Sequence, residues 1–301
     1  GHYDPRQNFD GSLEIQIPPL LADVDPWLGE TAADNRFVTF DGPDDQLPEM
    51  AIGRLPVNSV AELQTVLQKI EAYDSAELGA WAGRITVVSD DTDEAGDFAD
   101  HSDKLIRDFF PRPWQTNRYY LPQAQDDGGV LLDSIRNSWN AGNGLVMFTG
   151  HSSIHQWAAE RLFHIDEVPS LEHAGQLPIV MGMSCFTSSF HYPEADVMDE
   201  DLLRRLDGGA VATWGATGLG VSTGHDSLAN GFLNTIFNTD DKSLGSAAVA
   251  GKLKLVIDQS THVDLLDTFT LFGDPATQAR LTQPADGTTM YLPIISEFSR
   301  Q

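Results

Sequence analysis

Residues 177–185 have the sequence Leu-Pro-Ile-Val-Met-Gly-Met-Ser-Cys, a continuous apolar run that ends on the only cysteine of the chain. Three further runs of the same kind occupy residues 85–88, 145–148 and 210–214. Segments with apolar residues at helical spacing lie between these runs. Continuous apolar strands that alternate with amphipathic helices are typical of parallel sheets buried on both faces. The sequence therefore predicts an α/β fold, with a mostly parallel sheet flanked by helices on both sides.

The segment before the first of these runs has a different composition. It is rich in Asp, Pro and Gly up to about residue 53, and a helix follows that begins at Ser59. Ser59 and Glu62 form a capping box, and Val60, Leu63 and Ile70 fall on one helical face. We expect residues 1–80 to form a smaller N-terminal subdomain, residues 81–283 a larger one, and residues 284–301 a tail or linker.

Polar residues follow the carboxyl ends of the predicted strands, where open parallel sheets carry their functional residues. Asp90 and Asp91 follow one strand, His151 and Ser152 another, and Cys185 a third. A thiol, an imidazole and a carboxylate at one sheet edge suit nucleophilic acyl transfer. Two alternatives remain: a lone cysteine is often a small buried apolar side chain, and an isolated histidine is often an ordinary loop residue. His155 and His191 could also compete with His151 as the base.

Composition limits the partners of the chain. It has 301 residues, 41% of them apolar, which is typical of a globular protein. Its 45 acidic and 18 basic residues give a formal charge of −27, which repels nucleic acid and anionic membranes and attracts cations and basic polypeptides. No apolar stretch approaches the roughly 20 residues of a membrane span. The sequence gives no indication of the oligomeric state.

Four segments in order resemble the gingipain-type cysteine peptidases of the caspase-like clan. These segments are residues 48–56, residues 148–153 with Trp157 after them, residues 177–185 and residues 266–275. The resemblance covers roughly residues 20–280 and implies a caspase-like α/β fold with a truncated N-terminal subdomain. It also implies a cysteine endopeptidase that forms a thioester through a Cys-His dyad, with residues 81–283 as the catalytic part.

The resemblance assigns a role to each matching residue. Cys185 matches the nucleophile and His151 the general base. The backbone N–H groups of Cys185 and Ser152 match the oxyanion hole, although Ser152 stands where the family usually has glycine. The acidic partner of the histidine matches Asp91 or Asp90, and alignment favours Asp91.

Substrate contacts follow from the same resemblance. A carboxylate at the base of the S1 pocket would select Arg or Lys at P1, and Asp97 or Asp226 could supply it. Trp157 and Thr217 are further candidate substrate contacts, with core packing as the alternative for Trp157.

The resemblance also bears on ions, partners and location. No cofactor is required for the chemistry, but structural Ca²⁺ could bind acidic loops such as residues 90–94 and 41–45. The expected partners are polypeptide substrates, and the expected location is secreted or at the cell surface. A transpeptidase of the same fold and an inactive binding module are the rival functions.

Overall fold

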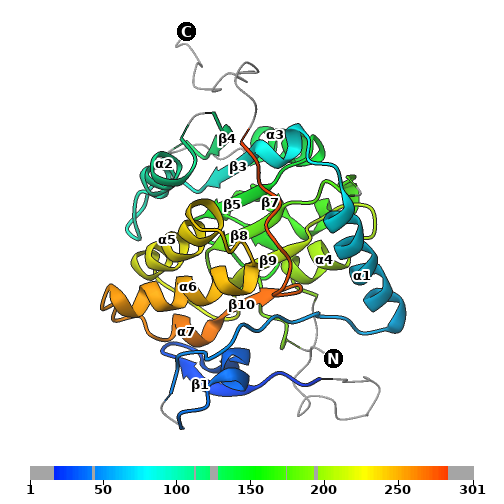
Figure 1. Cartoon of the computed structure of the whole chain (residues 1–301). Coiled ribbons are helices and arrows are strands. Elements are labelled where there is room, and N and C mark those ends of the chain that lie inside the picture. The colour runs from blue at the N-terminus through cyan, green and yellow to red at the C-terminus, as the bar shows by residue number, and fades with distance from the viewer. Residues whose placement is uncertain are drawn as a thin grey trace.

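The structure, a computed structural model, describes residues 17–42, 45–111, 113–122, 128–173, 175–192 and 196–283. Its centre is a six-stranded sheet with the order β10-β9-β8-β5-β3-β4 (Figure 1). Neighbouring strands are parallel except β10, which is antiparallel to β9. The strands are β3 (Arg84–Ser89), β4 (Gln115–Tyr120), β5 (Leu145–Thr149), β8 (Ile179–Met183), β9 (Ala212–Ala216) and β10 (Phe269–Phe272). The predicted α/β fold with a mostly parallel sheet is confirmed.

The central strands lack polar alternation because both of their faces are covered. Every residue of β5, β8 and β9 is buried. Successive side chains point to opposite faces, so Val87 belongs to one hydrophobic core and Val88 to the other. β9 begins and ends two residues later than the apolar run predicts, so Thr217 is the first residue after the strand.

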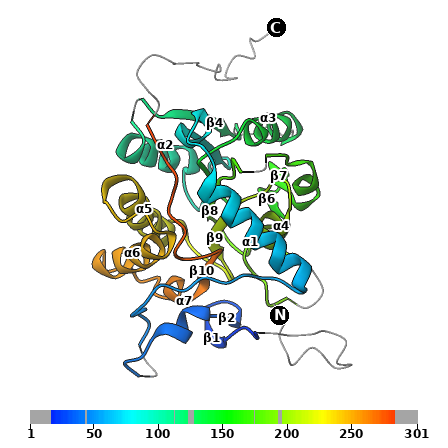
Figure 2. The same cartoon turned by 45° about the vertical axis from the view of Figure 1, so that its right-hand side comes forward.

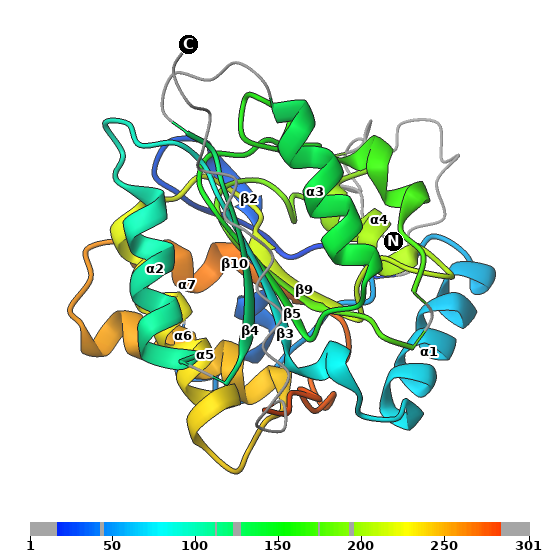
Figure 3. The same ribbon diagram turned by 90° about the horizontal axis from the view of Figure 1, so that it is seen from above.

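Helices cover both faces of the sheet. Seen from above, α2, α5 and α6 lie on one side and α3 and α4 on the other (Figure 3). Lys69 on α1 is buried, and its Nζ donates hydrogen bonds to the carbonyls of Leu202 and Leu203. These bonds fix α1 to the end of α4. The helices are α1 (Val60–Ser75), α2 (Phe98–Phe109), α3 (Gly128–Asn140), α4 (Met198–Arg204), α5 (Ser222–Asn238), α6 (Leu244–Ile257) and α7 (Leu265–Thr268).

The N-terminal segment packs beside α7 and the β10 edge of the sheet (Figure 2). It consists of a hairpin, β1 (Leu21–Asp25) and β2 (Gly29–Ala32), followed by the 3-10 helix η2 (Asp34–Val38). A buried ion pair between Arg54 and Asp34 and a bidentate one between Arg36 and Asp267, at 2.7 Å, stabilise this packing. The subdomain boundary near residue 80 stays a prediction, and residues 284–301 lie outside the described residues.

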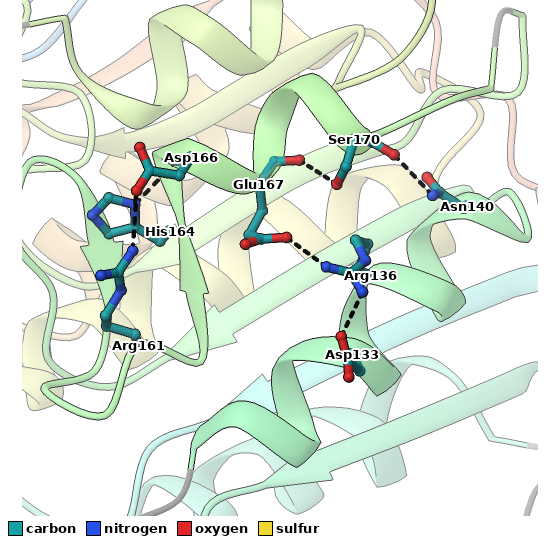
Figure 4. Close-up of polar contacts among 8 residues, drawn as sticks. All are labelled: Asp133, Arg136, Asn140, Arg161, His164, Asp166, Glu167 and Ser170. Carbon is teal, nitrogen blue, oxygen red and sulfur yellow. Dashed lines mark hydrogen bonds and ion pairs between the residues drawn. The ribbon is translucent and has the colours of Figure 1, made fainter.

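A polar network connects α3 to the chain that follows the short strands β6 (Gln156–Trp157) and β7 (Phe163–His164). Arg136 on α3 contacts Asp133 on its own helix and Glu167 on the 3-10 helix η4 (Ile165–Ser170) (Figure 4). Asn140 donates to the Ser170 carbonyl at 3.0 Å. A further 3-10 helix, η3 (Ala80–Gly83), leads into β3. The network holds η4 against α3.

Candidate active site

The strand register brings the predicted loops together at one sheet edge. Ser89 pairs with Thr149 and Thr149 pairs with Met183, so β3, β5 and β8 end level with one another. The next residues along these strands include Asp90, His151 and Cys185. The carboxylate, imidazole and thiol loops are therefore direct neighbours.

The loop after β5 is built around a glycine and a buried carboxylate. Gly150 has a φ of +154°, and a Cβ there would lie 2.3 Å from the Cβ of Asp90. The Asp90 carboxylate accepts hydrogen bonds from the backbone N–H groups of His151, at 2.9 Å, and Asp91, at 3.0 Å. Burial raises the pKa of Asp90, and these hydrogen bonds offset part of the rise. Asp90 thus positions the backbone of His151 rather than its ring.

The His151 ring contacts a different aspartate from those expected. Its Nε2 lies 2.7 Å from Asp93 Oδ2, and the edge of Phe98 packs against the ring at a centroid distance of 5.4 Å. Burial acts to raise the pKa of Asp93, but hydrogen bonds from Ala95 N–H and from His151 hold it below its usual range.

The expectation that Asp91 or Asp90 orients the ring is therefore corrected to Asp93. The physical reason is a tight turn, in which Asp93 and Gly96 exchange backbone hydrogen bonds at 3.1 and 3.3 Å. The turn directs the Asp93 side chain to His151, whereas the Asp90 carboxylate points inward. Gly96 ahead of the helix N-cap Asp97 is the signal that could have predicted this turn.

The loop after β8 leaves Cys185 half-buried. Cys185 Sγ lies 3.8 Å from the carbonyl oxygen of Gly220. Burial raises the pKa of the Cys185 thiol, and Asp25 adds to the rise while the Gly220 contact opposes it. Phe186 adopts a φ of 60°, and its N–H donates to the Gly218 carbonyl at 3.1 Å. Across the described residues, no hydrogen bond or ion pair joins Cys185 to His151.

Ser152 links the two loops. Its Oγ accepts a hydrogen bond from the Cys185 N–H at 3.0 Å and donates to the Cys185 carbonyl. Among the described non-glycine residues, left-handed φ values occur only at Ala158, Arg161, Phe186 and Gln259. Serine at this position therefore carries no left-handed strain, and its backbone N–H is retained in the predicted oxyanion site.

The two candidate S1 carboxylates have different surroundings. Asp97 is the N-cap of α2 and accepts a hydrogen bond from Asp100 N–H at 2.9 Å, which gives it a structural role. Asp226 on α5 forms an ion pair with His101 on α2 at 3.4 Å. Burial raises the pKa of Asp226, and His101 and Lys104 oppose the rise. Asp226 is thus the candidate whose carboxylate is not used as a helix cap.

Trp157 and Thr217 are not surface contacts. Trp157 is fully buried and stacks on Phe148 with a centroid distance of 4.8 Å, so the alternative of core packing holds. Thr217 is also fully buried, and its Oγ1 donates to the carbonyls of Ala32, at 2.7 Å, and Thr268, at 3.0 Å. The expected substrate contacts at both positions are corrected, because each side chain is used inside the fold.

The competing histidines have contacts of their own. His191 Nε2 lies 3.3 Å from Thr31 Oγ1. The ring of His155 lies 6.3 Å from that of His164, which is labelled in Figure 4. His151 is the histidine that directly follows β5 at the level of Cys185.

A buried carboxylate that no sequence pattern indicated contacts the loop after Cys185. Asp199, near the start of α4, accepts a hydrogen bond from Ser188 Oγ at 2.6 Å, and its N–H donates to the Thr187 carbonyl at 3.2 Å. Burial raises the pKa of Asp199 to about 6, and hydrogen bonds from Ser188 and Thr187 limit the rise. A run of acidic residues at a helix start resembles an ordinary solvated helix terminus, so the pattern gave no sign of this contact.

One acidic cluster could hold a metal ion. Oxygen atoms of Asp41, Asp45 and Glu49 lie within 4.8 Å of one another. The same carboxylates accept hydrogen bonds from Asp41 N–H, at 3.2 Å, and from Phe40 N–H, at 3.0 Å. In the other candidate loop, Asp90 and Asp93 are engaged with His151. Structural calcium therefore stays a prediction.

Residues 1–280 match the family model for peptidase family C25. The chain belongs to peptidase family C25. This confirms the resemblance to gingipain-type cysteine peptidases. Gingipain R2 of Porphyromonas gingivalis is 24% identical to the C25 chain over 259 residues, which cover 81% of this chain and 34% of the relative. Gingipain R1 of the same species is 24% identical over 257 residues, covering 80% of this chain and 25% of the relative. The chain thus spans between a quarter and about a third of these relatives.

Solved structures show the same fold. The Arg-specific cysteine proteinase gingipain R superposes with a TM-score of 0.70 at 20% identity, over 83% of this C25 chain and 60% of that protein. A second protease structure gives a TM-score of 0.72 at 16% identity, over 87% and 63% of the two chains. The caspase-like α/β fold is confirmed. None of the described helices of this C25 member combines the length and apolar character needed to span a membrane.

Proposed function

We propose that this C25 member is a cysteine endopeptidase in which Cys185 is the nucleophile and His151 the general base. The observation that carries the proposal is the alignment of the ends of β5 and β8, which places these two residues on adjacent loops. Family membership supports the same reaction class. A thiol and an imidazole at neighbouring strand ends meet the requirement of nucleophilic acyl transfer.

Asp93 gives the base its orientation in this mechanism. When His151 donates a hydrogen bond from Nε2–H to Asp93, its Nδ1 carries the lone pair that can accept a proton. Proton transfer from the Cys185 thiol to Nδ1 yields a thiolate that attacks the substrate carbonyl carbon. His151 then returns the proton to the leaving amine, and a thioester remains on Cys185.

Two backbone donors would stabilise the tetrahedral intermediate. The N–H groups of Cys185 and Ser152 belong to the adjacent loops and would bind the oxyanion. Water, activated by His151, then hydrolyses the thioester and restores the thiol. In a transpeptidase, a substrate amine would take the place of water at this last step.

We propose a preference for Arg or Lys at P1, supported by two observations. The structurally similar gingipain R is an Arg-specific proteinase, and this chain carries a formal charge of −27 that favours basic substrates. Asp226 would pair with the basic side chain in competition with His101. Polypeptide substrates, a secreted or surface location and structural Ca²⁺ are further proposals that rest on the resemblance to gingipains.

A positional-scanning peptide library tests the reaction and its specificity together. We expect cleavage after Arg or Lys by the wild-type protein and a loss of at least 1,000-fold in kcat/KM for Cys185→Ala. Ser153→Ala is the matched control, because Ser153 lies in the same region and its Oγ accepts only a local hydrogen bond from His155 N–H at 3.3 Å. Hydrolysis that survives Cys185→Ala contradicts the mechanism.

Two further measurements separate the rival functions. Added amine nucleophiles would divert the thioester of a transpeptidase into amide products, whereas a hydrolase gives mainly the free acid. Failure of Cys185 to react with iodoacetamide or a peptidyl acyloxymethyl ketone in the folded protein at neutral pH would favour an inactive binding module.

A further inference from the structure

The Ser152 side chain lies at the centre of the predicted oxyanion site. Its Oγ is 3.0 Å from the Cys185 backbone nitrogen, whose N–H it accepts, and it donates its own proton to the Cys185 carbonyl. A substrate oxyanion would lie about 2.7–3.1 Å from the same donor. The serine oxygen thus occupies the position that the substrate oxygen needs.

The backbone around Ser152 is held independently of this contact. Ala158 N–H donates to the His151 carbonyl at 2.8 Å, and Ser153 N–H donates to the Gln156 carbonyl at 2.9 Å. These two bonds flank the pairing of Ser152 with Trp157 and leave the Ser152 N–H out of the ladder. A rotation about the side-chain χ1 bond would therefore clear the site without moving the backbone donor.

In the free protein, the Cys185 thiol and the His151 imidazole also have partners of their own. The Cys185 thiol contacts the Gly220 carbonyl, and the His151 Nε2 contacts Asp93. The thiol and imidazole are each engaged with another partner, and the oxyanion donor is engaged with Ser152. The thiol contact and the Ser152 contact must rearrange when a substrate binds, whereas the contact with Asp93 is the one that orients His151.

We propose that Ser152 is a cap on the oxyanion site: its hydroxyl occupies the place of the substrate oxygen in the free protein, and the substrate must displace it. This inference rests on the proposed peptidase function, since the cap acts on that reaction. Displacement breaks the two contacts with Cys185, while solvent or substrate offers the hydroxyl new ones. Because the net contribution of such exchanged hydrogen bonds is modest, the cap tunes the reaction rather than blocking it.

Ser152→Ala removes the cap and keeps the backbone donor. We expect kcat/KM for a peptide amide to rise about tenfold, which corresponds to about 1.4 kcal/mol. The inhibition constant of a peptide aldehyde that ends in arginine should fall by a similar factor, because its hemithioacetal places an oxygen in the same site. Ser153→Ala should change neither value by more than about twofold, as expected for a substitution that leaves the oxyanion site intact.

Alkylation of Cys185 by iodoacetamide requires no oxyanion site and serves as an internal reference. Its rate should be the same in wild type and Ser152→Ala. A loss of about 100-fold in kcat/KM with unchanged alkylation would show that the hydroxyl is an oxyanion donor, and that result overturns the cap. Unchanged aldehyde affinity overturns it as well.

The failure of the proposed function has a different signature. If neither protein hydrolyses any peptide, the peptidase proposal fails, while the affinity of the aldehyde for the Cys185 thiol still reports on the cap. Thermal unfolding checks the integrity of each variant. If Ser152→Ala does not fold, Ser152→Gly, which carries the residue usual in the family, provides the same comparison.

Discussion

The loops after β5 and β8 hold their functional side chains in opposite ways. The His151 side chain is 56% exposed and its Asp93 partner is 41% exposed, so a carboxylate holds the ring in a solvated position. Cys185 is half-buried, and main-chain bonds to residues 216–218 hold the loop that carries it. A solvated carboxylate contact thus fixes the ring of His151, whereas main-chain contacts fix the loop that carries Cys185.

Gly150→Ala is expected to have the largest effect, because the added Cβ would meet the buried Asp90 side chain beneath the loop after β5. The substitution combines an unfavourable positive φ with a Cβ 2.3 Å from that of Asp90. We expect a loss of about 3–5 kcal/mol in the free energy of unfolding, measured by urea denaturation. Gly175→Ala is the matched control, because its φ is +81° but no atom lies closer than 3.9 Å to the added Cβ. Equal losses in both variants would mean that the Asp90 contact is unimportant.

Asp199→Asn tests the buried carboxylate that contacts the loop after Cys185. The pKa of Asp199 in the folded protein is about 6, and an unfolded aspartate titrates near pH 3.9. The folded state therefore binds more protons between these values. The contribution of protonated Asp199 to the free energy of unfolding is fully present below about pH 4 and is lost as the pH rises through about 6.

The size of this effect is about 3 kcal/mol. The difference between the pH-stability curves of wild type and Asp199→Asn, measured by urea unfolding from pH 4 to pH 8, should show it. Asp240→Asn, an exposed substitution, should give a curve parallel to wild type over the same range. A flat difference curve for Asp199→Asn contradicts the prediction.

Asp93→Asn tests the exposed contact of His151 and should have the smallest effect on the free energy of unfolding. The variant loses the charged acceptor of His151 Nε2, and we expect kcat/KM to fall about 10- to 100-fold because the base is less well oriented. Because the ion pair is exposed, the free energy of unfolding should change by less than about 1 kcal/mol. Asp91→Asn is the control and should retain activity within about twofold. A larger loss in Asp91→Asn than in Asp93→Asn would restore the original assignment.

Sequence periodicity was sufficient for the fold and for the neighbouring loops. The runs that became β3, β5 and β8 are apolar throughout because helices cover both faces of the sheet. Parallel strands that end in register bring their following residues together, so the proximity of the His151 and Cys185 loops could be predicted.

Side-chain direction within those loops could not be predicted in the same way. Asp90, Asp91 and Asp93 are chemically alike in the sequence, and only the turn closed by Gly96 selects Asp93 for the ring. Trp157 and Thr217 come after predicted strands in the sequence, as substrate contacts could, but the tertiary structure buries both.

The sequence by itself determined the α/β fold, the family and the pair of residues proposed for catalysis. The reason is that strand periodicity and the order of the strands are encoded in local sequence patterns, which do not depend on how the elements pack. The tertiary structure alone decided that Asp93 contacts the His151 ring, that Asp199 contacts Ser188 in the loop after Cys185, and that the Ser152 hydroxyl contacts the Cys185 N–H. These depend on distances of a few ångströms between residues far apart in sequence, which no local pattern encodes.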